Sequence, residues 1–180
     1  STVIAKNDAM QRVLRQLELA IKTTQPVHFW GETGTGKEHL ARVVHFESEQ
    51  RRKIFIPLNC ADLPPRELKQ TVKKIFERDF EDSVPLEPGV IFLSQIESLT
   101  RDIQELILAN YQSATHKDNV RLMTASSFSL TNLLDQELLL PDFFYLITTM
   151  ELRIPPLRER REDLEVLAQH FLENENRYQQ

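Results

Sequence analysis

The strongest constraint on the fold is a glycine-rich loop between a predicted strand and a predicted helix. The chain has four glycines in 180 residues, and three of them fall within six positions. The loop reads Gly31-Glu32-Thr33-Gly34-Thr35-Gly36-Lys37-Glu38. Glycine lets a backbone turn tightly and direct several N–H groups at one anion. The spacing G-x-x-x-x-G-K therefore predicts a phosphate-binding P-loop in which Lys37 reaches the β- and γ-phosphates.

The hydrophobic pattern around this loop alternates between short apolar strands and amphipathic helices. Strands are expected at 27–30, 54–58, 90–93, 120–125 and 149–154, with Pro57 placing the second strand at a sheet edge. One helix, capped by Asn7, should run to about residue 21, and others should span 36–48, 66–79, 100–114 and the residues from 161. The alternation predicts an α/β fold with a mostly parallel sheet covered on both faces.

Composition and charge exclude several classes of protein. A net charge of -5 makes this segment a poor candidate for wrapping nucleic acid. The chain shows neither a bilayer-length apolar run nor a signal peptide, so we expect no membrane partner. The lone Cys60 is expected to be a small buried residue, and the five histidines lack the spacing of a metal site. A cytoplasmic location is the expectation.

The loop sequence GETGTGKE resembles the Walker A motif of the AAA+ domain of sigma-54-dependent transcription activators, the bacterial enhancer-binding proteins. Further stretches resemble the same family, namely Asn59-Cys60-Ala61, the Walker B strand 89–93, the sensor I strand 121–125 and the strand-to-lid junction 154–164. The resemblance implies a three-layer αβα P-loop NTPase core with a five-stranded, mostly parallel sheet in residues 1–160. Residues 161–180 would be the first helix of a truncated lid, so we expect the chain to be part of a longer protein.

The chain departs from the family where the chemistry of hydrolysis is expected. The family's Walker B strand ends in Asp-Glu, whereas this chain has Ser94 and Gln95 there. A glutamine can orient a water molecule but cannot take its proton, and a serine is a weak neutral ligand for Mg²⁺. Glu97 would share the orientation of Gln95 on a continuing strand, so rescue by Glu97 is an open but disfavoured alternative. P-loops in general have Ser or Thr after the lysine, whereas this chain has Glu38. The resemblance implies that a glutamate at this position is usual in the family.

Two other family elements are also missing. The aligned positions of the trans-acting arginines hold Leu140 and Leu146, and an arginine finger contributes a factor of roughly 10³–10⁵ to the rate. The family contacts sigma-54 through a GAFTGA loop before the Walker B strand, but no glycine lies between Lys37 and Gly89. The intervening residues 66–88 are expected to form a short charged helix and a loop.

The remaining candidate residues are secondary. The sensor I polar residue corresponds to Ser127 or Ser126. In the family, the asparagine at the position of Asn59 is expected to switch the Walker B glutamate, and this chain has Gln95 in place of that glutamate. Val3 and Ile4 are candidates for contact with the base, because the resemblance places the N-terminal segment there. Trp30 is expected to pack in the protein, although stacking on adenine is an alternative.

These observations predict the central nucleotide-binding regulatory domain of a bacterial transcription regulator. It should bind ATP or ADP, with weakly held Mg²⁺, through residues 31–38, and it should lack catalytic residues for hydrolysis and for remodelling sigma-54 holoenzyme. The resemblance implies self-association through AAA+ surfaces. In the full protein it also implies contact with RNA polymerase and DNA binding through a further domain. Two alternatives stay open: an active ATPase of the enhancer-binding type, and an interaction scaffold that binds another phosphate ligand such as a cyclic dinucleotide.

Overall fold

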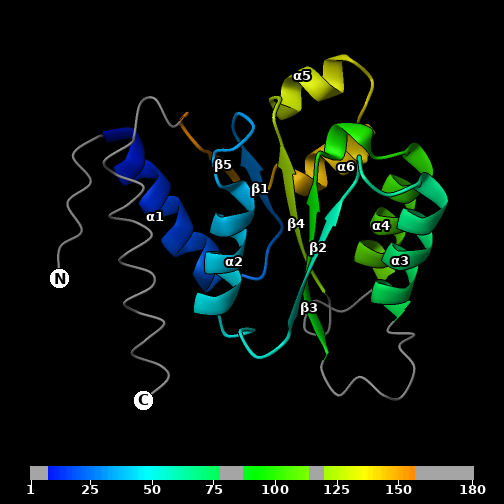
Figure 1. Ribbon diagram of the computed structural model, residues 1–180, viewed down its shortest axis with the longest axis horizontal. Coiled ribbons are helices and arrows are strands. Elements are labelled where there is room, and N and C mark those ends of the chain that lie inside the picture. The colour runs from blue at the N-terminus through cyan, green and yellow to red at the C-terminus, as the bar shows by residue number, and fades with distance from the viewer. Residues whose placement is uncertain (1–7, 78–86, 114–119, 157–180) are drawn as a thin grey trace.

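A five-stranded parallel sheet forms the centre of the molecule (Figure 1). The computed structural model describes residues 8–77, 87–113 and 120–156. The strands are β1 (Val27–Trp30), β2 (Ile54–Asn59), β3 (Pro88–Ser94), β4 (Arg121–Ser126) and β5 (Glu151–Arg153). They lie in the order β2-β3-β4-β1-β5, and every pairing is parallel. The predicted α/β fold and all five predicted strands are confirmed.

Helices cover both faces of this sheet. Helices α1 (Asp8–Lys22) and α2 (Lys37–Glu47) lie on one side, and α3 (Pro65–Glu77) and α4 (Arg101–Ser113) on the other (Figure 1). The sequence predicted these four within a few residues. It missed α5 (Leu130–Asp135), α6 (Pro141–Ile147) and the 3₁₀ turn η1 (Ile96–Ser98), since such short elements show little helical periodicity. The predicted helix from residue 161, and the whole of the proposed lid, lie outside the described residues.

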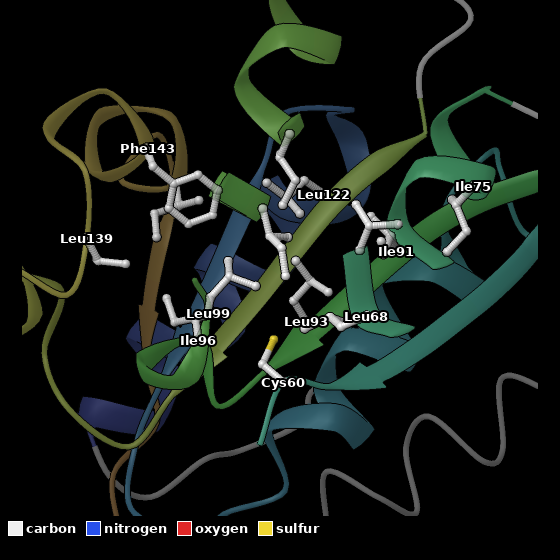
Figure 2. Packing of buried hydrophobic residues seen from close by; sticks show 14 of the residues in the cluster. Cys60, Leu68, Ile75, Ile91, Leu93, Ile96, Leu99, Leu122, Leu139 and Phe143 are labelled. Atoms are coloured by element: carbon white, nitrogen blue, oxygen red, sulfur yellow. The ribbon is translucent and has the colours of Figure 1, made fainter. Parts of the chain in front are cut away.

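Strand β3 joins the two layers of the core. Val90 and Phe92 pack in the apolar cluster beneath α1 and α2, whereas Ile91 and Leu93 pack in the cluster beneath α3 and α4. Successive side chains of a strand point to opposite faces, so a strand covered on both sides must be apolar at every position. Figure 2 shows Ile91 and Leu93 in the second cluster together with Leu68 and Ile75 of α3. Strand β2 lies at the edge, as Pro57 predicted, and Pro57 is exposed there.

A buried glutamine on α4 holds the chain segment that leads into α6. The side chain of Gln104 is fully buried and donates from Nε2 to the carbonyl oxygens of Leu99 (3.0 Å) and Leu138 (2.9 Å). Its Oε1 accepts a hydrogen bond of 2.8 Å from the backbone N–H of Leu140. One side chain therefore satisfies three backbone groups of two separate loops.

We expect Gln104→Leu to lower the free energy of unfolding by about 2–4 kcal/mol, because it leaves buried backbone groups without partners. Urea unfolding at neutral pH measures this. Gln136→Leu is the matched control: the Gln136 side chain is exposed and, within the described part of the chain, bonds only Asn132, so its loss should stay within about 0.5 kcal/mol. Equal losses in both variants would show that Gln104 does not fasten the loops.

Candidate functional site

The glycine loop has the backbone conformation that an anion cradle requires. Gly34 and Gly36 have φ values of 79° and 82°, in the left-handed region where a side chain is strained. Gly36 is the residue before α2, and no side chain caps that helix. The N–H groups of the first turn of a helix have no partners within it and carry its positive dipole end, so they favour a phosphate group.

Lys37 is held by its own loop. Its Nζ donates to the carbonyl oxygens of Gly31 (2.6 Å) and Glu32 (2.9 Å). Burial lowers the pKa of Lys37, and the nearby negative charge of Glu97 opposes this change. A phosphate group that draws Lys37 to itself must therefore compete with two backbone carbonyls.

A pocket of about 240 Å³ opens beside this loop. It brings together six of the eight predicted loop residues, Asn59 at the end of β2, Ser94 and Gln95 at the end of β3, and Ser127 after β4, whereas the predicted Gly31 and Glu32 are not in its lining. Residues lining the pocket from the loop are Thr33, Gly34, Thr35, Gly36, Lys37 and Glu38. The strand register explains this meeting, because Trp30 aligns with Ser126 and Asn59 aligns with Ser94. Parallel strands thus place their carboxyl ends at one edge, where ligands bind in open α/β sheets.

Four polar side chains fix the loop and its surroundings. Thr35 is buried and donates to the carbonyl oxygen of Glu32 at 2.8 Å, so it stabilises the turn from within. The hydroxyls of Thr33 and Ser127 are 3.3 Å apart and connect the loop to the end of β4. Asn59 accepts from the backbone N–H of Ala61 at 2.9 Å, which shapes the turn after β2.

The groups available to a cation in this pocket are mostly neutral. Ser94 offers a hydroxyl and Gln95 an amide, and Gln95 adopts φ 52°, an uncommon backbone conformation for a residue other than glycine. Glu38 carries a carboxylate, but its Oε1 accepts from Arg42 at 2.8 and 3.2 Å. In the described part of the chain, no group of three or more His, Cys, Asp or Glu side chains could hold a metal ion. Hard divalent cations prefer carboxylate oxygens, and the lining of this pocket offers few of them.

The third strand does not extend as far as Glu97. Strand β3 stops at Ser94, and the positive φ of Gln95 starts the turn η1 that contains Glu97. The premise that Glu97 shares the orientation of Gln95 on a continuing strand is therefore wrong.

A buried histidine, which the sequence did not single out as functional, connects β1 to the end of β4. His28 is fully buried, with Nδ1 at 2.8 Å from the Thr124 hydroxyl and Nε2 at 3.0 Å from the Ser126 hydroxyl. Ser126 donates its own hydrogen to the carbonyl oxygen of Phe128, so Nε2 is the nitrogen that donates to Ser126. Ser126 and Ser127 both line the pocket, but the Ser126 hydroxyl is bonded inside the sheet, whereas the Ser127 hydroxyl lies against Thr33 of the glycine loop.

Other predicted residues lie away from the pocket. Leu140 and Leu146 are half-buried and pack against the apolar cluster beneath α3 and α4, and neither lines the pocket beside the glycine loop. The Arg153 guanidinium lies over the Trp30 ring at 4.9 Å from its centroid, as expected of a packing residue. Cys60 is buried, as predicted, and burial raises the pKa of its thiol to about 12. Val3 and Ile4 lie outside the described residues.

A larger pocket, of about 450 Å³, lies elsewhere in the molecule. It is lined by residues such as Pro26, Val120 and Arg121, which stand at the amino ends of β1 and β4. In the described part of the chain, its lining includes none of the glycines and no lysine. We therefore place the functional site at the smaller pocket, where the backbone geometry is specialised.

A parallel αβα sheet with a glycine loop and lysine between β1 and α2 defines a P-loop nucleotide-binding domain. Residues 4–157 match the Sigma-54 interaction domain family, and the chain belongs to this family.

Individual proteins agree with this assignment. The chain is 30% identical over 193 aligned residues to the DNA-binding transcriptional activator HyfR of Escherichia coli. The alignment covers 98% of this chain and 29% of HyfR. It is 31% identical over 191 residues to the regulator NtrC of Azospirillum brasilense, covering 94% of this chain and 39% of NtrC. The chain thus spans about a third of these relatives' length.

Solved structures show the same fold. A crystal structure of NtrX from Brucella abortus in complex with ADP superposes with a TM-score of 0.71 at 21% identity, covering 93% of this chain and 41% of NtrX. The P-loop NTPase domain of a Sigma-54 activator from E. coli gives 0.67 at 22% identity, covering 86% of this chain and 99% of that one. No helix in the described residues has the length and apolar character needed to cross a membrane.

The buried imidazole of His28 predicts a pH dependence of stability. Burial, with a smaller contribution from the Lys37 charge, lowers the pKa of His28 to about 3. The ordinary pKa in the unfolded chain is near 6.5, so protons bind preferentially to the unfolded state between about pH 3 and pH 6.5, and stability falls as the pH falls through this window. Between pH 7.5 and 5.5 the wild type should lose about 1.4 kcal/mol more stability than His28→Gln.

Urea unfolding at the two pH values measures this difference. His39→Gln, on the exposed surface of α2, is the control and should keep the wild-type pH slope. Identical slopes in the wild type and in His28→Gln would contradict the assignment of His28 as a buried neutral imidazole.

Proposed function

We propose that this chain is the central regulatory domain of a bacterial transcription regulator, and that it binds ATP or ADP but does not hydrolyse ATP. Family membership supports the regulatory role. The structures of NtrX in complex with ADP and with ATP support nucleotide as the ligand of this fold. The observation that carries the proposal is an intact phosphate loop facing a strand end that holds Ser94 and Gln95.

The loop fits a nucleotide through its backbone. The N–H groups around Gly34 and Gly36 and at the start of α2 would hold the phosphates, and Lys37 would exchange its two loop carbonyls for phosphate oxygens. The bound nucleotide supplies a compact polyanion at this point. Mg²⁺ would find the neutral oxygens of Ser94 and Gln95, which hold a hard cation weakly.

The same strand end accounts for the proposed lack of hydrolysis. Attack of water on the γ-phosphate is assisted by a carboxylate that positions and polarises the water. Gln95 lines the pocket but its amide cannot accept the proton. The leucines at 140 and 146 pack against the core and bring no positive charge to a neighbouring subunit. Each loss alone reduces turnover, and the arginine-finger contribution is a factor of roughly 10³–10⁵.

We also propose that this chain does not remodel sigma-54 holoenzyme. Residues between Lys37 and Gly89 include no glycine, and α3 in this interval packs Leu68, Val72 and Ile75 into the core. The interval therefore builds a core helix, with its charged residues outside, and has no sequence that matches GAFTGA.

Interactions of the whole protein go beyond this segment. The relatives extend over about three times its length, and their names describe DNA-binding regulators. We propose that contact with RNA polymerase and with DNA depends on other parts of the full protein, that AAA+ surfaces allow self-association, and that the protein works in the cytoplasm. Residues 1–160 would form the core and 161–180 the start of the lid.

Calorimetry with a non-hydrolysable ATP analogue tests the binding site. We expect saturable binding by the wild type and a loss of at least about tenfold in affinity in Lys37→Ala, because a charge-assisted hydrogen bond to phosphate is removed. Lys69→Ala removes an exposed lysine of α3 and should bind like the wild type. An absence of binding up to millimolar analogue would overturn the proposal.

A phosphate-release assay with ATP and Mg²⁺ tests the absence of turnover. Wild-type release should equal that of Lys37→Ala at the same protein concentration. Steady release well above this control would instead support the active ATPase, and binding of a cyclic dinucleotide without competition by ATP would support the scaffold.

A further inference from the structure

A carboxylate stands in the lining of the pocket that we assign to the phosphates. Of the described side chains that line this pocket, Glu38 supplies the only carboxylate, directly after Lys37. Glu38 lies in the first turn of α2, where P-loops in general carry a hydroxyl that binds Mg²⁺ beside the phosphates. The positive end of the helix dipole attracts a carboxylate there as it attracts a phosphate. A free Glu38 carboxylate would therefore repel a polyphosphate and compete with it for Lys37.

Arg42 binds this carboxylate from one helical turn further along α2. Its Nη2 and Nε lie 2.8 and 3.2 Å from Oε1 of Glu38, so two charge-assisted hydrogen bonds meet at one oxygen. Residues four positions apart lie on the same face of a helix, which makes this pairing local to α2. Lys37 instead donates to the carbonyl oxygens of Gly31 and Glu32. The carboxylate is thus bonded to the arginine, while the lysine of the loop is bonded to backbone.

The Arg42 guanidinium is also positioned by the sheet. It lies over the ring of Phe55 in β2, at 4.7 Å from the ring centroid. Phe55 is buried and stacks on Phe92 of β3, with the two centroids 5.8 Å apart. A cation over an aromatic ring is attracted by its quadrupole, so the guanidinium has a preferred place although its side chain is partly exposed. Exposed ion pairs contribute little to stability, so the importance of this one lies in where it holds charge.

We propose that Arg42 is a positioning residue for nucleotide binding, because it pairs with the Glu38 carboxylate and thereby leaves the charge of Lys37 available to the phosphates. The inference rests on the proposed nucleotide site. Arg42 is not among the residues that line the pocket, so it acts through Glu38 and not on the nucleotide. An arginine that contacted the phosphates directly would be needed whether or not residue 38 carries a charge.

Calorimetry with the non-hydrolysable ATP analogue tests this role. Arg42→Gln should bind about fivefold more weakly than the wild type, because it leaves an uncompensated carboxylate beside the phosphates. Glu38→Gln should bind at least as tightly as the wild type. The double variant Glu38→Gln/Arg42→Gln should regain the wild-type affinity within about twofold, since neither charge is then present. Arg42→Lys keeps a cation at this position and should retain most of the affinity.

Lys73→Gln is the matched control, because it removes the cation of an exposed pair with the same spacing. Lys73 Nζ lies 3.8 Å from Oε1 of Glu77 on α3, and neither residue lines the pocket. This variant should bind like the wild type. Thermal unfolding should lower the Tm of Arg42→Gln by no more than about 5 °C, so that a loss of affinity is separated from a loss of fold.

Two results would overturn the proposal. One is wild-type affinity in Arg42→Gln, and the other is a double variant that binds as weakly as Arg42→Gln, since Arg42 would then act without Glu38. Both results leave nucleotide binding by the wild type intact, whereas no binding by the wild type would overturn the proposed function as well.

Discussion

The site depends on the parallel register of the sheet. Pairing of β1 with β4, and of β2 with β3, brings Trp30 level with Ser126 and Asn59 level with Ser94. The polar groups that face the loop from the sheet, those of Asn59, Ser94, Gln95 and Ser127, lie at these strand ends or on the residue after them. A register shift of one residue would turn the side chains of a strand to the opposite face, so the core and the site are fixed by the same hydrogen-bond ladder.

Much of the fold could be predicted from local pattern. The strand at 90–93 is apolar at every position, and Val90 and Ile91 indeed enter opposite layers. The glycine loop was predictable because Gly34 and Gly36 perform a backbone task that other residues perform poorly. Short elements escaped prediction because six or seven residues, as in α5 and α6, contain fewer than two helical turns.

The polar interior could not be predicted in the same way. His28 and Thr124 are 96 positions apart in the chain, and Gln104 bonds backbone groups up to 36 positions away. Such contacts follow from the sheet order, which periodicity does not specify. The position of Glu97 was misjudged for a local reason: the left-handed backbone of Gln95 ends the strand, and glutamine carries no sequence signal for that conformation.

The contacts of Lys37 have a consequence for which anions can bind. An entering anion must release an ammonium group from two carbonyl oxygens, at a cost of about 1 kcal/mol for each hydrogen bond, or roughly a thirtyfold reduction in affinity. A small singly charged ion offers little in exchange. A chain of two or three phosphates can also bind the N–H groups of the loop, which offsets this cost. The contacts of Lys37 therefore lower the affinity for simple anions more than the affinity for polyphosphates.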